Sequence, residues 1–130
     1  MMKLYKKRIA KIMCVSHKAL NHFKELAGES DAIVIYNGVD TEFYNPNLPI
    51  PYKKGTPQLL FVSVLRKYKK TGFVIDAIPE LLKKYPNVHL QIVGIGEDYQ
   101  NMKNKINQMQ LKDHVEMLGK ISDEELKLRY

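Results

Sequence analysis

The chain of 130 residues has one cysteine, no tryptophan and no long apolar run. A single cysteine excludes a disulfide within the chain, and Cys14 stands in a short apolar stretch that is typical of a buried position. No segment approaches the roughly 20 apolar residues of a membrane span. The basic N-terminus lacks the apolar core and the cleavage site of a signal peptide. These absences predict a cytoplasmic protein.

Patterns that would indicate a metal site or a catalytic triad are also missing. The four histidines do not have the spacing of metal ligands; they are His17, His22, His89 and His114. No serine, histidine and aspartate are arranged as in a hydrolytic triad. The sequence therefore predicts no metal site and no catalytic residue in this chain.

The chain is basic, with 21 Lys and Arg against 14 Asp and Glu and a net charge of +7. Such an excess fits anionic partners, for example nucleotide diphosphates, acidic membrane surfaces or nucleic acid. The lysines are spread widely, so we expect most of them on solvated helix faces. Residues 3–11 are basic with apolar residues interleaved, which leaves open a weak peripheral contact with a membrane.

The first third of the chain predicts two short strands with a helix between them. Residues 12–15 and 33–35 are short apolar runs, and Ser16 is a good N-cap for a helix that Gly28 ends. Asn37-Gly38 marks a turn, which on local signals alone could belong to a hairpin. Residues 46–57 contain four prolines and Gly55, a composition that predicts a linker.

The remainder alternates between strands and helices. Apolar strands are expected at 58–63, 88–93 and 115–118. A helix is expected over 72–85, which Pro79 should kink or leave with one unpaired carbonyl, and another over 99–109. Ser122 and Glu125 form a capping box that opens a further helix. The alternation predicts an α/β fold, with βαβ units and a Rossmann-like parallel sheet. Three strands are few for such a sheet, so this second domain is expected to be incomplete.

Three stretches, in this order, resemble the retaining glycosyltransferases of the GT-B fold, known as group 1 or family 4. Residues 33–43 (IVIYNGVDTEF) are similar to the end of the family's N-terminal domain. Residues 60–63 (LFVS), with the lysine-rich loop and Gly72, are similar to the first strand and loop of its C-terminal domain. Residues 90–97 (LQIVGIGE) are similar to its L-x-I-V-G-x-G segment.

The resemblance implies a partial GT-B fold in which the C-terminal domain binds a nucleotide-diphosphate sugar. It places residues 1–45 at the end of the acceptor-side domain, 46–57 in the interdomain linker and 58–130 in the first part of the donor-binding domain. Members transfer a hexosyl-type sugar from that donor to an acceptor with retention, without a metal or a redox cofactor. The acceptor and the donor sugar are unknown from these residues.

The candidate donor site is the basic loop after the strand over 58–63. A cationic loop at the carboxyl end of a parallel strand, next to a helix start, is a place where α/β folds bind anions. The resemblance assigns the donor diphosphate to Lys69 and Lys70, with Arg66 and Lys67 as helpers. From the residue pattern alone, a solvated loop is the alternative. Val64 stands where the family has an arginine. The family's pair of glutamates has no counterpart in this sequence.

Glycines and an asparagine complete the set of candidate site residues. Gly94 and Gly96 either let the backbone approach the donor or form a plain tight turn. The third glycine of G-x-G-x-x-G is replaced by Tyr99, so dinucleotide binding is poorly supported. The resemblance places Asn37 and Gly38 in a cleft loop that joins the two domains.

Three functional hypotheses follow. The first is a glycosyltransferase fragment that binds a nucleotide sugar and is inactive alone, because catalysis needs contacts from both domains. The second is a non-enzymatic binding or subunit module that pairs with a separately encoded remainder. The third is a small basic nucleic-acid binder, which the lack of any nucleic-acid motif disfavours, so we expect no nucleic-acid partner.

Overall fold

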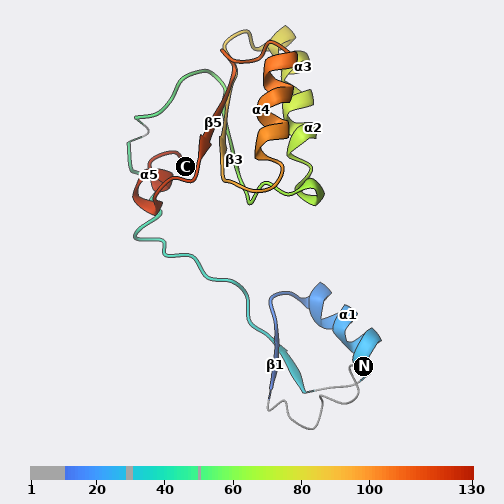
Figure 1. Cartoon of the computed structure of the whole chain (residues 1–130). Coiled ribbons are helices and arrows are strands. Elements are labelled where there is room, and N and C mark those ends of the chain that lie inside the picture. The colour runs from blue at the N-terminus through green and yellow to red at the C-terminus, as the bar shows by residue number, and fades with distance from the viewer. Residues whose placement is uncertain (1–10, 29–30, 50) are drawn as a thin grey trace. The chain divides into compact units, whose positions relative to one another are not determined.

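The computed structural model describes residues 11–28, 31–49 and 51–130 (Figure 1). The chain divides after Thr41 into two compact units. The domain boundaries expected from the sequence, with a linker over 46–57, stay a prediction. The basic segment 3–11, considered for membrane contact, lies outside the described residues except for Lys11, whose Nζ is 2.7 Å from Asp31 Oδ2.

The first unit contains a βαβ element. Strand β1 (Ile12–Cys14) pairs in parallel with β2 (Ala32–Val34), and helix α1 (His17–Ala27) connects them. The Ser16 hydroxyl accepts from the backbone N–H of Ala19 at 3.1 Å, which satisfies one of the unpaired donors of the first turn. Gly28, at φ 73°, ends the helix. Both features confirm the prediction from the sequence.

The second unit is built on a three-stranded parallel sheet in the order β3-β4-β5. The strands are β3 (Gln58–Val62), β4 (His89–Val93) and β5 (Val115–Gly119). Between them lie the 3-10 turn η3 (Lys67–Lys69) and helices α2 (Thr71–Asp76), α3 (Ile78–Lys84) and α4 (Tyr99–Gln108), and α5 (Asp123–Lys127) follows β5. The predicted α/β class with a parallel sheet is confirmed.

The helix expected over 72–85 is present but is divided into two at Ala77, which itself keeps right-handed helical angles. Helix α2 ends at Asp76 and α3 begins at Ile78, with Pro79 in the first turn of α3. The first N–H groups of a helix have no partner within it, so a proline there removes no hydrogen bond. The disturbance expected from Pro79 thus takes the form of a break two residues before it, and Pro79 itself lies in the first turn of α3.

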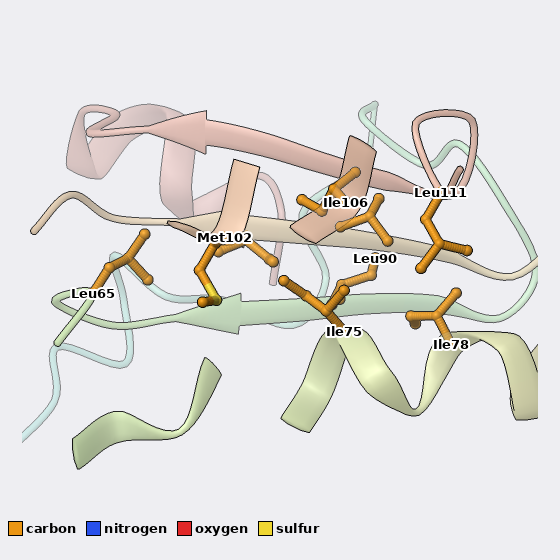
Figure 2. Packing of buried hydrophobic residues seen from close by; sticks show 9 residues of the cluster. Leu65, Ile75, Ile78, Leu90, Met102, Ile106 and Leu111 are labelled. Carbon is orange, nitrogen blue, oxygen red and sulfur yellow. The ribbon is translucent and has the colours of Figure 1, made fainter. Parts of the chain in front are cut away.

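An apolar core lies between the sheet and helices α2, α3 and α4 (Figures 1 and 2). Leu90 and Ile92 of β4 point to this face and are almost fully buried. Each such side chain contributes roughly 1.5–3 kcal/mol through removal from water. The core cluster consists of Leu65, Ile75, Ile78, Leu90, Ile92, Met102, Ile106, Leu111 and Val115.

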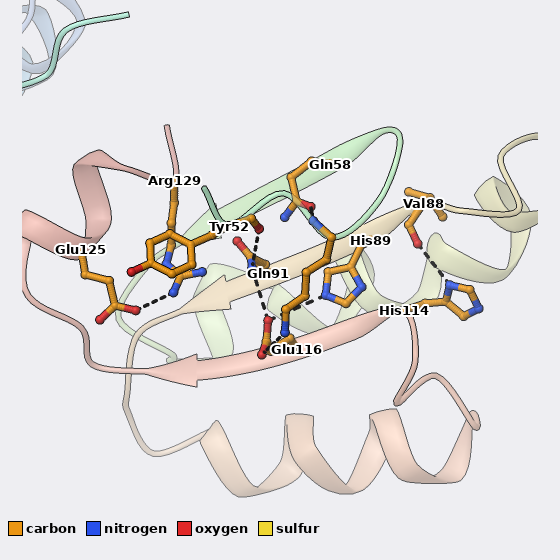
Figure 3. A network of polar contacts seen from close by, with 10 residues as sticks. Tyr52, Gln58, Val88, His89, Gln91, His114, Glu116, Glu125 and Arg129 are labelled. Atoms are coloured by element: carbon orange, nitrogen blue, oxygen red, sulfur yellow. Dashed lines mark hydrogen bonds and ion pairs between the residues drawn. The ribbon is translucent and has the colours of Figure 1, made fainter. Parts of the chain in front are cut away.

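The opposite face of the sheet carries a network of polar side chains (Figure 3). Gln91 alternates with Leu90 and Ile92 along β4, is 1% exposed and lies in register with Glu116 of β5. Its Nε2 contacts Glu116 Oε2 at 3.3 Å and the Tyr52 carbonyl oxygen at 3.4 Å. The chain preceding β3 thus contacts this face of the sheet.

Candidate functional site

The loops that follow β3 and β4 lie against each other at the carboxyl ends of the strands. The backbone N–H of Ser63 donates to Val93 O at 3.0 Å, and that of Leu65 donates to Ile95 O at 3.0 Å. The N–H of Asp98, which precedes α4, donates to Leu65 O at 3.1 Å. The basic loop and the glycine loop therefore form one connected edge.

Close backbone packing requires both glycines of the second loop. A Cβ on Gly94 would lie 1.8 Å from Ser63 O, and a Cβ on Gly96 would lie 2.2 Å from Leu65 O. Gly94 also has a φ of +135°, which side-chain-bearing residues rarely adopt. The packing of the two loops explains both glycines, and a direct contact of either with a donor stays a prediction.

The lysine-rich loop is ordered by its own backbone. The N–H of Lys69 donates to Arg66 O at 2.9 Å, and that of Lys70 donates to Lys67 O at 3.2 Å. Lys70 has left-handed backbone angles, φ 57° and ψ 29°, and immediately precedes α2. The Lys69 ammonium lies 5.4 Å from the centre of the Tyr68 ring, and that of Lys70 lies 5.7 Å from the Phe73 ring.

The two lysines that the sequence could not distinguish differ in position. An open hollow of about 340 Å³ lies between this loop and α4. Lys70 lines it and Lys69 does not. The residues that line the hollow are Lys67, Lys70, Gly72, Phe73, Asp98, Met102 and Lys105.

The charge around the hollow is positive on balance. Lys105 forms an ion pair with Asp76, with Nζ and Oδ2 2.6 Å apart, and the Asp98 carboxylate accepts from Asn101 Nδ2 at 2.8 Å. Lys67 and Lys70 add two further ammonium groups to the wall, against the single carboxylate of Asp98. The arrangement therefore suits an anionic group such as a phosphate.

Sequence reasoning missed two charged contributors to this hollow, Asp98 and Lys105. Lys105 stands in α4 between Met102 and Ile106, which are both buried, so the helical period places it at the margin of the packed face. No local motif marks either residue, because the approach of α4 to the lysine-rich loop is a tertiary contact.

The remaining candidate residues are exposed and do not line the hollow. Arg66 and Val64 are both exposed and flank the fully buried Leu65. Asn37 and Gly38 are exposed in a stretch that is neither helix nor strand. The hairpin considered from local signals is wrong, since the strand that follows in the described chain is β3 and it pairs with β4, not with β2. Contact of Asn37 or Gly38 with a ligand stays a prediction.

Within residues 11–28, 31–49 and 51–130, no group of three or more His, Cys, Asp or Glu side chains could hold a metal ion. In that same part of the chain, no helix has the length and apolar character needed to cross a membrane.

Comparison with known proteins identifies the family. The model of the family described as "Glycosyl transferases group 1" matches residues 47–130, which contain both loops of the candidate site. The chain belongs to this family. The match covers more than half of the sequence, including all of β3, β4 and β5.

Curated relatives of this glycosyltransferase chain are much longer. It is 30% identical over 115 residues to a subunit of phosphatidylinositol N-acetylglucosaminyltransferase from Arabidopsis thaliana, covering 87% of this chain and 26% of the relative. It is 32% identical over 83 residues to an uncharacterized glycosyltransferase of Haemophilus influenzae, covering 61% of this chain and 24% of the relative. The chain thus spans about a quarter of the length of these relatives.

Solved structures agree on the fold. The chain is similar to S. aureus TarM, solved with Fondaparinux, alpha-GlcNAc-glycerol and UDP, with a TM-score of 0.75 and 16% identity over 92% of this chain and 23% of TarM. It is also similar to Anabaena HepE, solved with UDP-glucose, with a TM-score of 0.73 and 23% identity over 94% of this chain and 36% of HepE. The chain therefore has part of a GT-B fold, with Rossmann-like units.

Proposed function

We propose that this chain is a donor-binding part of a retaining family 4 glycosyltransferase, which moves a hexosyl sugar from a nucleotide-diphosphate donor to an acceptor. One observation carries the proposal: the lysine-rich loop and the glycine loop lie against each other at the carboxyl ends of parallel strands β3 and β4. In α/β folds this edge is where anionic ligands bind. Membership of the glycosyl transferases group 1 family supports a nucleotide-diphosphate sugar as this anion.

Within this site, the proposed ligand of the diphosphate is the lysine-rich loop. Lys70 and Lys67 line the hollow, whereas Lys69 and Arg66 lie on the same loop outside it. A diphosphate gains from converging ammonium groups, which act as point charges. The glycine loop contributes through Gly94 and Gly96 by keeping its backbone close to the lysine loop.

The proposed chemistry needs no metal and no redox cofactor, and this chain by itself is proposed to be inactive. Sugar transfer requires contacts with the transition state from the acceptor side as well as from the donor side. This chain spans 26% and 24% of the two curated relatives, which agrees with a site completed by further polypeptide. Any membrane contact is proposed to be weak and peripheral.

Titration with UDP and with GDP, followed by thermal unfolding, tests donor binding. A ligand that binds only the folded chain at a hundred times its Kd stabilises it by about 2.7 kcal/mol. We expect a saturable upward shift in Tm that the double substitution Lys69→Ala and Lys70→Ala removes. The matched control is Lys83→Ala with Lys84→Ala, which removes the same charge at the end of α3, just before β4 begins.

Retention of the shift in the Lys69/Lys70 variant would show that neither of these two lysines is needed to bind the diphosphate. The absence of any shift in folded wild-type chain would contradict donor binding by the chain.

A second candidate function is that of one component of an assembly whose remainder is separately encoded. The relative from Arabidopsis thaliana is itself named as an enzyme subunit, which favours this candidate. A chain of this kind is expected to gain stability when its partner is co-expressed, because binding to the folded state alone raises Tm.

A further inference from the structure

The proline-rich stretch before β3 has the composition of a linker, yet the structure anchors it to the second unit at three places. We call residues 43–57 the strap; Ile50 within it lies outside the described residues. The first anchor is aromatic. The Tyr44 ring lies edge-on to Phe43 at 4.9 Å and to Tyr130 at 5.7 Å, and the Lys127 ammonium is 4.3 Å from the centre of the Phe43 ring. These contacts attach the start of the strap to α5 and the residues after it.

The second anchor joins the strap to the polar face of the sheet (Figure 3). The Arg129 guanidinium carbon lies 4.0 Å from the centre of the Tyr52 ring. Lys54 Nζ is 2.7 Å from Glu116 Oε1 of β5. Because these partners come from the sheet and from the end of the chain, the middle of the strap is bound from two sides.

The third anchor is backbone packing just before β3. The N–H of Thr56 donates to Asn87 O at 2.8 Å. A Cβ on Gly55 would lie 2.2 Å from the same carbonyl oxygen, so the two backbones are in direct contact. The N–H of Lys54 donates to the Gln58 side-chain oxygen at 3.0 Å. The end of the strap is therefore part of the folded unit.

The stretch before the strap takes part in none of the three anchors, and a ring contact joins Tyr36 to His17 of α1, with the ring centres 6.1 Å apart. Every residue from 35 to 42 is exposed, and residues 35–40 are neither helix nor strand. Tyr36 and Val39 are 65% and 67% exposed, and a Cβ added to Gly38 would meet nothing within 4 Å. Asn-Gly is also a sequence that adopts many backbone conformations at low cost.

We propose that the strap is a fixed part of the second unit and that the hinge between the two units is residues 36–41. A change in backbone angles within 36–41 breaks none of the three anchors, whereas a change within the strap must break at least one. The prolines agree with this assignment, because they restrict the backbone of the strap. The strap therefore follows the donor-side sheet in any movement of one unit against the other. This inference does not depend on the proposed ligand.

Hydrogen exchange followed by mass spectrometry on the full chain tests the proposal. Amides of residues 54–56 are expected to exchange at least about tenfold more slowly than those of 36–41, since the former belong to a packed unit and local opening governs exchange. Equal rates in the two segments would overturn the proposal.

The variant Glu116→Ala removes the partner of Lys54 and is expected to speed exchange in 52–57 by several-fold without changing 36–41. The matched control Glu80→Ala breaks the exposed pair with Lys83 on α3 and is expected to change neither segment. If Glu116→Ala does not fold, Lys54→Met breaks the same pair from the exposed side. Unchanged exchange of the strap in the folded variant, or faster exchange in 36–41 alone, would overturn the proposal.

Discussion

Lys54 and Glu116 lie 62 residues apart in the sequence, and their side chains meet at 2.7 Å on the polar face of the second sheet. Burial by itself would raise the pKa of Glu116. Hydrogen bonds from Lys54 and Gln91, together with the charges of Lys54 and His89, outweigh burial and lower that pKa below its ordinary value of 4.5. Glu116 therefore holds its charge at lower pH in the folded chain than in the unfolded chain.

This lowered pKa predicts a loss of stability in acid. The contribution of Glu116 is complete above pH 4.5 and disappears as the pH falls through the lower pKa of the folded state. Because both side chains are partly exposed, we expect it to be at most about 1 kcal/mol. Glu116→Gln should be less stable than wild type at pH 7 and lose less stability below pH 4.5, as measured by urea unfolding at a series of pH values. Parallel curves of unfolding free energy against pH for the two proteins would contradict the prediction. The control is Glu80→Gln, which changes a carboxylate on the surface of α3.

The close packing of the two site loops predicts that one methyl group added at Gly94 strongly lowers the stability of the fold. Gly94→Ala places a Cβ 1.8 Å from Ser63 O and forces alanine to a φ of +135°. We expect the free energy of unfolding to fall by at least about 2 kcal/mol, because neither backbone can move without breaking the pairing of β3 with β4. Gly38→Ala, with open space around the added methyl, should change it by less than about 0.5 kcal/mol. Equal effects of the two substitutions in denaturant unfolding would contradict this.

The strands and helices were largely predictable because each depends on a local pattern. The apolar run over 58–63, the cap at Ser16 and the stop at Gly28 each determine backbone structure within a few residues. For Pro79 the sequence indicated a disturbed helix but not the form of the disturbance, which is a break at Ala77. A proline disrupts a helix interior but fits a first turn, and the sequence alone does not say where the first turn begins.

The candidate site was predictable only in part. The sequence indicated its two loops, but not the residues of α4 that lie next to them. The basic loop and the glycine loop follow apolar strands, so their place at the carboxyl edge follows from a parallel sheet. Lys105 and Asp98 line the hollow through a tertiary approach of α4 that no local signal indicates. The three anchors of the strap were missed for the same reason, because composition reveals prolines but not the partners that a segment contacts.

The packing of the core predicts that shortening one buried side chain of α2 strongly lowers the free energy of unfolding. Ile75 is fully buried in the cluster beneath the sheet, and Ile75→Ala should lower the free energy of unfolding by about 2–5 kcal/mol. Phe73→Ala, two positions away on the same helix, removes a larger side chain that is 68% exposed. Its effect is expected to be within about 0.5 kcal/mol. A larger loss for Phe73→Ala than for Ile75→Ala in urea unfolding would mean that α2 packs by its other face.

The left-handed backbone of Lys70 and its place in the wall of the hollow predict that one substitution has opposite effects on stability and on UDP binding. Its φ of 57° is unfavourable for a residue with a Cβ, by roughly 1–2 kcal/mol in the left-handed region. Lys70→Gly should therefore leave the free energy of unfolding unchanged or raise it, up to about 1 kcal/mol, because glycine adopts this conformation freely and has more entropy to lose. If Lys70 holds the donor phosphate in the hollow, the same variant should weaken UDP binding by about tenfold or more.

The substitution Lys69→Gly distinguishes the role of Lys69 from that of Lys70. Lys69 lies in the 3-10 turn with no left-handed strain to relieve, so the substitution should cost stability, up to about 1 kcal/mol. Lys69 also lies outside the hollow, so UDP affinity should change less than in Lys70→Gly. Calorimetric titration with UDP and urea unfolding of both variants give the two quantities. Loss of UDP binding in Lys69→Gly with unchanged binding in Lys70→Gly would place the phosphate outside the hollow, on the side of the loop that carries Lys69.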